Sequence, residues 1–260
     1  MRNNRTDLIF FLLSLLLVVL SVPANAENLR LPSSVVDYRL GLLPNTGDDI
    51  FVEFLGGSQK TWGGSDTRDG GEAYGGGGIV KNVHFDRGLQ AGIRVGFRPT
   101  RSLLVSLALT HSASMVSWEG FFPAIGSAST FQGGAISTAL LTNVAIDAFR
   151  SDQLSIRPFL GLGIARNRLT EVIESDSTGG IFISKVESGK RTSPIAQIGV
   201  ELNDALSPAT TLTLYASATH LGEFGTGETR WRNIGVRPIK PYEINGAWQL
   251  AVGVAVSVRF

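Results

Sequence analysis

The chain of 260 residues contains no cysteine and only five lysines, and charged residues amount to 17% of it. Without cysteine there is neither a disulfide framework nor a thiolate metal site. So few charges exclude the charged surface of an average soluble domain, in which about 25% of residues are charged. Glycine is abundant, with 31 residues, but it has no three-residue period, which excludes collagen.

The one long apolar run, Leu8 to Val22, stands near the N-terminus. Two arginines precede it, and the small residues of Ala24-Asn25-Ala26 follow it. This order is typical of a secretory signal peptide, and the run is shorter than the roughly 20 residues that a membrane-spanning helix needs. We therefore predict a signal peptide over residues 1–26, with an uncleaved N-terminal anchor as the alternative. Its removal leaves a formally neutral chain, which disfavours binding to nucleic acid.

Beyond this leader, large apolar residues alternate with small or polar ones, which is the pattern of β-strands with two unlike faces. The last stretch is the clearest, because every second residue from 248 to 260 is large and apolar. The alternation predicts eight strands, at residues 48–57, 87–98, 101–112, 132–149, 154–170, 192–204, 209–221 and 246–260.

The connections between these strands alternate in length. Short turns alternate with long connections at residues 58–86, 113–131, 171–191 and 222–245. This predicts an antiparallel up-and-down topology with the short turns at one end. Short periplasmic turns and four long extracellular loops are typical of an outer-membrane β-barrel. We predict a periplasmic N-terminal segment over residues 27–47 and an all-β, eight-stranded transmembrane barrel over residues 48–260.

A soluble lipocalin-like binding barrel would also alternate, so the second face of the strands must decide between the two. In a soluble barrel that face meets water and carries lysine and glutamate, but here it carries mostly glycine, alanine, serine and threonine. Small side chains suit the interior of a narrow barrel, and the large apolar ones must then point outward into lipid. We therefore expect contact with outer-membrane lipid and lipopolysaccharide, and the soluble barrel stays an alternative.

Some charged residues share the parity of the small face and are expected in the lumen, where a charge needs a partner. Because their signs balance, we predict a lumen network of ion pairs and amides. Its predicted members are Glu53, Arg94, Asn143, Asp147, Arg157, Gln197, Glu201, Gln249 and Arg259. Side chains largely fill an eight-stranded barrel, so a structural network is expected, with an ion-conducting constriction as the alternative.

The long connections are expected to be exposed loops. Their charges, Glu174 and Arg230 among them, would then be solvated. The alternatives are a divalent cation or lipopolysaccharide at Glu171, Glu174 and Asp176, and lipid phosphates at Arg230 and Arg232. Trp118 is expected near the outer membrane interface, where aromatic residues gather in barrels of this kind.

Three segments resemble those of the opacity-protein-like outer-membrane barrels of Gram-negative bacteria. Residues 157–165 are similar to the pattern P-Y/F-x-G-x-G-x-A of that family, and residues 214–227 to its Y-x-Y-x-x-L-G-x-x-x-T-G segment, with Ser217 in place of the second tyrosine. The chain also ends in Phe260 after an alternating strand, like the terminal strand that the outer-membrane assembly machinery recognises. The resemblance implies an outer-membrane location after export through the periplasm.

The function to be expected is that of a surface protein with a narrow polar lumen, in a structural, surface-interaction or weakly porin-like role. The alternative from a different class is a lipid A-modifying enzyme, because a serine, a histidine and an acid within hydrogen-bond reach can form a nucleophilic site. The residues that could form it are His111, Ser112, His220 and Glu223. No cofactor and no metal are expected, and no surface ligand can be named.

Overall fold

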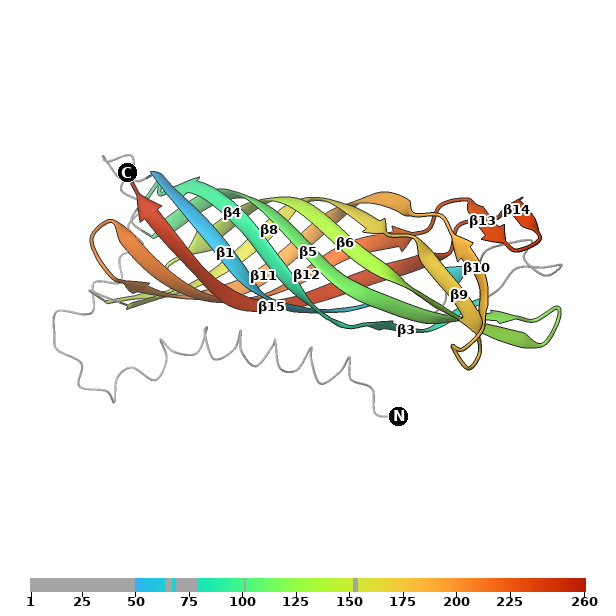
Figure 1. Ribbon diagram of the computed structural model, residues 1–260. Helices are drawn as coiled ribbons and strands as arrows, with labels where there is room; N and C mark the ends of the chain where they lie inside the picture. Colours follow the sequence, from blue (N-terminus) through green and yellow to red (C-terminus); the bar gives the residue numbers. More distant parts are fainter. Residues whose placement is uncertain (1–49, 64–66, 69–78, 101, 152–153) are drawn as a thin grey trace. The chain divides into compact units, whose positions relative to one another are not determined.

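The computed structural model describes residues 50–63, 67–68, 79–100, 102–151 and 154–260. The predicted leader over 1–26 and the segment over 27–47 lie outside the described residues. Within them, every regular element is a β-strand and every strand pairing is antiparallel (Figure 1). No helix in this part of the chain is both long and apolar enough to cross a membrane.

Eight long strands pair in a closed cycle, in which each strand has two long neighbours. In the order of the cycle they are β1 (Ile50–Trp62), β4 (Arg87–Phe97), β5 (Leu103–Phe122), β6 (Ser127–Ile146), β8 (Leu154–Leu169), β11 (Gly189–Ala205), β12 (Thr210–Gly225) and β15 (Glu243–Arg259), which returns to β1. Each strand predicted from the alternation overlaps one of these eight. β1 begins where β15 ends, beside the short connections, and we call this the turn end; the opposite end is the loop end.

Seven further short strands bring the total in the described residues to fifteen. They are β2 (Thr67–Arg68), β3 (Ile79–Phe85), β7 (Phe149–Arg150), β9 (Val172–Asp176), β10 (Phe182–Val186), β13 (Thr229–Arg232) and β14 (Gly235–Pro238). Six of them lengthen the sheet at the loop end, where β6, β9, β10, β13 and β14 pair in that order and β3 pairs with β5.

The prediction of four long loops is therefore wrong in part. The connection predicted at 113–131 is mostly strand, because β5 and β6 continue their pairing to Phe122 and Ser127 and leave a turn of only four residues. Alternation weakens in these segments, since inward residues at the loop end are themselves large and apolar. The period of two therefore gave no signal where the strands continued.

The two faces of the long strands differ as the alternation predicts. In β8 the outward Leu160 and Leu162 are 63% and 70% exposed, whereas Gly161 between them is buried. In β15 the valines at 252, 254 and 256 are exposed, and Ala251 and Ala255 are buried. The cycle thus has small and polar side chains inside and large apolar side chains outside, which is the reverse of a soluble protein.

Glycine makes room inside the cycle for two aromatic rings near the turn end. A Cβ added to Gly96 would lie 2.6 Å from the ring of Phe51, and one added to Gly199 would lie 2.4 Å from the ring of Phe159. The two rings belong to one small buried cluster with Leu104 and Ala145. Backbone and ring therefore approach each other more closely than any side chain would permit.

A larger apolar cluster fills the loop end. Trp118 stacks on Phe131 at 5.5 Å between ring centroids, and Tyr242 packs against Phe131 at 4.7 Å. All three side chains are buried, together with Phe85 and Phe224. The expectation that Trp118 lies in an exposed loop is wrong, because β5 is longer than predicted and the position of Trp118 in it has inward parity.

Candidate functional site: the charged lumen

Strand register brings the lumen charges together in pairs. Glu53 of β1 stands opposite Arg94 of β4, and Arg157 of β8 stands opposite Glu201 of β11. All four side chains are buried, because their positions have inward parity. Since β4 and β11 lie across the cycle from each other, the contact between Arg94 and Glu201 spans the lumen.

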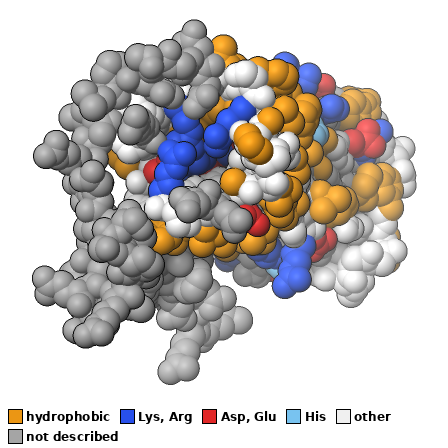
Figure 2. All heavy atoms as spheres, turned by 90° about the vertical axis from the view of Figure 1, so that its left-hand side faces the viewer, with side chains coloured by type: hydrophobic (Ala, Val, Ile, Leu, Met, Phe, Trp, Pro, Cys, Tyr) orange, Lys and Arg blue, Asp and Glu red, His pale blue; other side chains and the backbone are white. Residues whose placement is uncertain are grey.

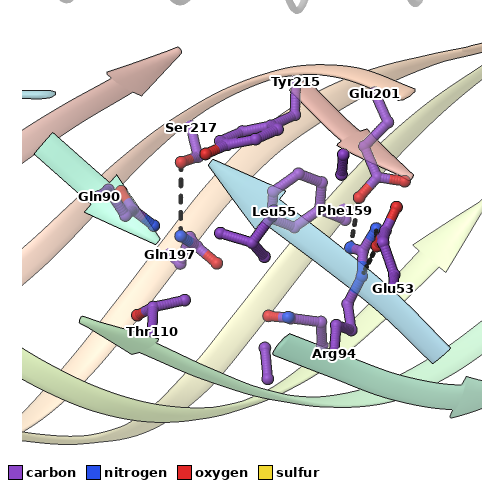
Figure 3. A pocket seen from close by; sticks show the side chains of 13 residues that line it. Glu53, Leu55, Gln90, Arg94, Thr110, Phe159, Gln197, Glu201, Tyr215 and Ser217 are labelled. Carbon is purple, nitrogen blue, oxygen red and sulfur yellow. Dashed lines mark hydrogen bonds and ion pairs between the residues drawn. The ribbon is translucent and has the colours of Figure 1, made fainter. Parts of the chain in front are cut away.

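The buried charges form one continuous alternating chain, of which Figure 3 shows the part formed by Glu53, Arg94 and Glu201. Arg94 pairs with both Glu53 and Glu201. The Nη1 of Arg157 donates to Glu201 Oε2 at 3.2 Å, and its Nε donates to Asp147 Oδ1 at 2.8 Å. The chain of contacts thus runs from β1 through the lumen to the turn after β6.

Arg98 completes this chain at the turn end, where its Nη1 donates to Asp147 Oδ2 at 2.7 Å. Its parity is inward, although it is not among the members predicted from the sequence. Arg259, which is among them, is half-buried and forms no ion pair within the described residues. Three buried arginines therefore face three buried carboxylates, and the balance of sign expected from the sequence holds with Arg98 in place of Arg259.

Seen from the turn end, basic side chains gather inside a ring of hydrophobic ones (Figure 2). Arg98 and Arg157 are buried at this end, and the exposed Arg150 lies 3.8 Å from Asp147. Desolvating such charges is expensive, and the cost is offset only when each has a well-placed partner. Each of the three buried arginines, Arg94, Arg98 and Arg157, has at least one carboxylate partner, so this condition is met.

The predicted amides do not all join the ion pairs. The Nε2 of Gln197 donates to Thr219 Oγ1 at 2.9 Å, and the Nε2 of Gln249 donates to Gln59 Oε1 at 2.7 Å. Gln249 thus belongs to a separate polar group closer to the loop end, which Gln59 shares with Thr61. One network was predicted, but the structure divides its members between two levels of the lumen.

Beside the ion pairs lies a cavity of about 30 Å³. Gln90, Asn143 and Tyr215 line it, together with Glu53 and Arg94 (Figure 3). The Oε1 of Gln90, the Oδ1 of Asn143 and the hydroxyl of Tyr215 have no hydrogen-bond partner among the described residues. This volume is on the scale of a few water molecules.

The four residues of the hydrolase alternative are not brought together. His111 and Ser112 are consecutive in β5, so His111 points outward, where its Nδ1 lies 3.0 Å from Thr138 Oγ1, and Ser112 points inward and is buried. His220 packs on Trp248 at 5.1 Å between ring centroids, and Glu223 is exposed. Because His111 and His220 have outward parity and Ser112 has inward parity, neither histidine lies on the face of the strands that carries Ser112.

A second buried ion pair lies at the loop end. Arg230 of β13 pairs with Glu174 of β9, its Nε donates to Ser184 Oγ at 2.7 Å, and the Ser184 hydroxyl donates to Glu174. All three side chains are buried, so the expectation that Glu174 and Arg230 are solvated loop charges is wrong. The reason is the pairing of β9, β10 and β13, which covers them.

Comparison with known proteins finds no matching family model and no matching curated protein. Among solved structures, the outer membrane protein OprG from Pseudomonas aeruginosa is similar at a TM-score of 0.49 and 13% identity, over 82% of this chain and 97% of that chain. A major outer membrane protein from Thermus thermophilus is similar at 0.47 and 11% identity, over 81% and 99%. The outer membrane protease OmpT from Escherichia coli is similar at 0.46 and 9% identity, over 83% and 98%.

Proposed function

We propose that the chain is an eight-stranded transmembrane β-barrel of the Gram-negative outer membrane, with a closed lumen and a structural or surface-interaction role. The observation that carries this proposal is the outward apolar face. The more than half-exposed residues Phe54, Leu89, Leu107, Leu160 and Val252 lie on β1, β4, β5, β8 and β15, on both sides of the cycle. Soluble monomers rarely expose contiguous apolar surface beyond a few hundred Å², and lipid is the solvent in which such a surface is stable.

The filled lumen favours a structural or surface role over a porin-like one. Arg94 bridges the lumen to Glu201, and the aromatic cluster around Trp118 occupies the loop end. The residues that could act on other molecules are then those beyond the apolar face at the loop end, which we assign to the cell exterior. The turn end, where β1 begins and β15 ends, is assigned to the periplasm. The separation of His111, Ser112 and His220 supports a role other than lipid A modification.

The membrane location is tested by introducing an arginine into the middle of the apolar face. Leu160→Arg is expected to destabilise a membrane barrel by about 2–4 kcal/mol, which lowers the temperature of its heat-modifiable migration on a gel. Leu206→Arg is the matched control, because Leu206 is 60% exposed in the turn between β11 and β12, outside the apolar face. A soluble barrel would tolerate both substitutions equally and would appear in the periplasmic fraction, which contradicts the proposal.

The closed lumen is tested by reconstituting the purified chain in planar bilayers. We expect no channel events for the wild-type chain. Steady conductance that Arg94→Gln alters would instead show that the lumen conducts. Lipid A mass spectra from cells with and without the chain are expected to be the same, and a difference abolished by His111→Ala or His220→Ala would establish the enzyme.

A further inference from the structure

Three basic side chains lie together on the outward face at the loop end of β8 and β11. Arg168 of β8 stands directly opposite Lys190 of β11, and Arg166 lies two residues away on the same face of β8. All three side chains are exposed. Like charges placed opposite each other across a strand pair destabilise it unless an anion lies between them. We call these three residues the basic patch.

No described residue supplies that anion. Two half-buried cations of the same region do have carboxylate partners, since Lys185 pairs with Glu171 and Arg191 lies 3.4 Å from Glu243. Within the described part of the chain, no ion pair or hydrogen bond involves the side chains of Arg166, Arg168 or Lys190, and only the backbone carbonyl of Lys190 accepts from Arg191 Nη1.

Apart from Lys190 itself, the cross-strand neighbours of the two arginines are uncharged. Arg166 stands opposite Thr138 of β6 on one side and Thr192 of β11 on the other, and Arg168 stands opposite Ile136. The patch is therefore a concentration of positive charge that the described protein leaves uncompensated.

The basic patch also lies at the border of the apolar face. On β8 the outward residues before Arg166 are Leu160, Leu162 and Ile164, and Pro194 stands opposite Ile164 on β11. In the orientation proposed above, this border is the level of the headgroups in the outer leaflet. An anion that reaches the patch from a lipid would have its acyl chains beside these apolar residues.

We propose that the basic patch binds a phosphate-bearing headgroup of an outer-leaflet lipid, such as the phosphate that lipid A carries. Two guanidinium groups can each offer a fork of donors to phosphate oxygens, and the ammonium group of Lys190 adds a third charge. The inference rests on the proposed membrane location. It adds where lipopolysaccharide binds, at the loop end of β8 and β11, and which residues bind it.

The test uses the mature chain reconstituted in phosphatidylcholine nanodiscs that contain lipid A, and measures the lipid A retained per protein after washing as a function of its concentration. Arg166→Gln/Arg168→Gln/Lys190→Gln is expected to lower the apparent affinity for lipid A about a hundredfold. The reason is that each of the three basic groups raises the affinity for an anionic lipid surface about fivefold. Unchanged retention in this variant would overturn the proposal.

A matched control removes three exposed cations elsewhere. Arg87→Gln/Arg237→Gln/Lys240→Gln changes the net charge equally and should retain lipid A like the wild-type chain. If both triple variants lost the same affinity for lipid A, net charge alone would explain the loss, and the proposal would be overturned.

Two further arms identify the ligand. Lipid A without its phosphates should be retained no better by the wild-type chain than by the basic-patch variant. Inorganic phosphate should not displace lipid A at equal concentration, and displacement would show that the site takes free phosphate rather than a lipid. A chain that fails to enter nanodiscs at all contradicts the membrane location, which separates that failure from a failure of the patch.

Discussion

Inside the turn end, buried arginines and carboxylates fill the cycle of strands, whereas inside the loop end stacked aromatic rings do so. Arg94 of β4 reaches Glu53 on the neighbouring β1 and Glu201 on β11 across the lumen. One side chain thus connects three strands. Trp118 and Phe131 come from adjacent strands and pack as in a soluble core. Charges therefore connect distant strands at one end, and apolar packing joins the added hairpins to the barrel at the other.

The largest effect on the stability of the whole barrel is expected from the turn end. Arg94→Met removes the only ion-pair partner that Glu53 has among the described residues and one of two partners of Glu201. Breaking a buried pair by removing one partner costs about 3–5 kcal/mol. Urea unfolding followed by tryptophan fluorescence should show that loss.

The double variant Glu53→Gln/Arg94→Met is the control for this prediction. It removes the buried carboxylate as well as the cation, and it should be more stable than Arg94→Met alone. A double variant whose loss equals the sum of the two single losses would mean that the pair contributes no coupling.

At the loop end, Phe131→Ala is expected to cost about 3–5 kcal/mol, but mainly in local stability. Phe131 is fully buried and contacts both Trp118 and Tyr242. Sub-global opening can leave the rest of a protein intact, so amide exchange should rise in β9, β10 and β13 and stay low in β1 and β15. Equal increases in both regions would show that the two ends unfold as one unit.

Much of the wall of the barrel could be predicted from the sequence, because a period of two follows from strand geometry alone. The parity of Glu53, Arg94, Arg157 and Glu201 placed them correctly in the interior. Their partners could not be predicted, since parity says nothing of register between strands far apart in sequence. Glu201 meets Arg94 only because β4 and β11 lie across the same cycle.

The loop end was predicted less well, for a related physical reason. Arg230 is buried because β13 pairs with β10, and that pairing joins two long connections that alternation cannot relate. Composition suggested exposure, because a charged residue among glycines and prolines is usually solvated. The signal that could have helped is the presence of one acid and one base, Glu174 and Arg230, in two apolar-flanked stretches of different loops.

A smaller effect on the free energy of unfolding is expected from adding a Cβ to a strand glycine that has no room for it, compared with a strand glycine that has room. Gly199→Ala places a Cβ 2.4 Å from the Phe159 ring and 2.6 Å from the Ala216 carbonyl oxygen. Overpacking of this kind costs about 1–3 kcal/mol. Gly56→Ala is the matched control, because no atom lies within 4 Å of its added Cβ. Urea midpoints should fall for Gly199→Ala and stay near the wild-type value for Gly56→Ala, and equal midpoints would contradict the close approach of Gly199 to Phe159.

The smallest expected effect is local and concerns the tip of the hairpin between β9 and β10. The Thr178 hydroxyl donates to Asp176 Oδ2 at 2.6 Å, and the backbone N–H groups of Ile181 and Gly180 donate to Oδ1 at 3.0 and 2.8 Å. These hydrogen bonds, that of Thr178 foremost, hold the pKa of Asp176 below its ordinary value. A lowered pKa in the folded state stabilises the turn above the pKa of the unfolded chain, and this stabilisation disappears as the pH falls through the folded value. Thr178→Ala should raise the pKa of Asp176 in a carboxyl NMR titration, and Thr178→Ser should keep it low. A pKa that stays low in Thr178→Ala would assign the effect to the backbone donors alone.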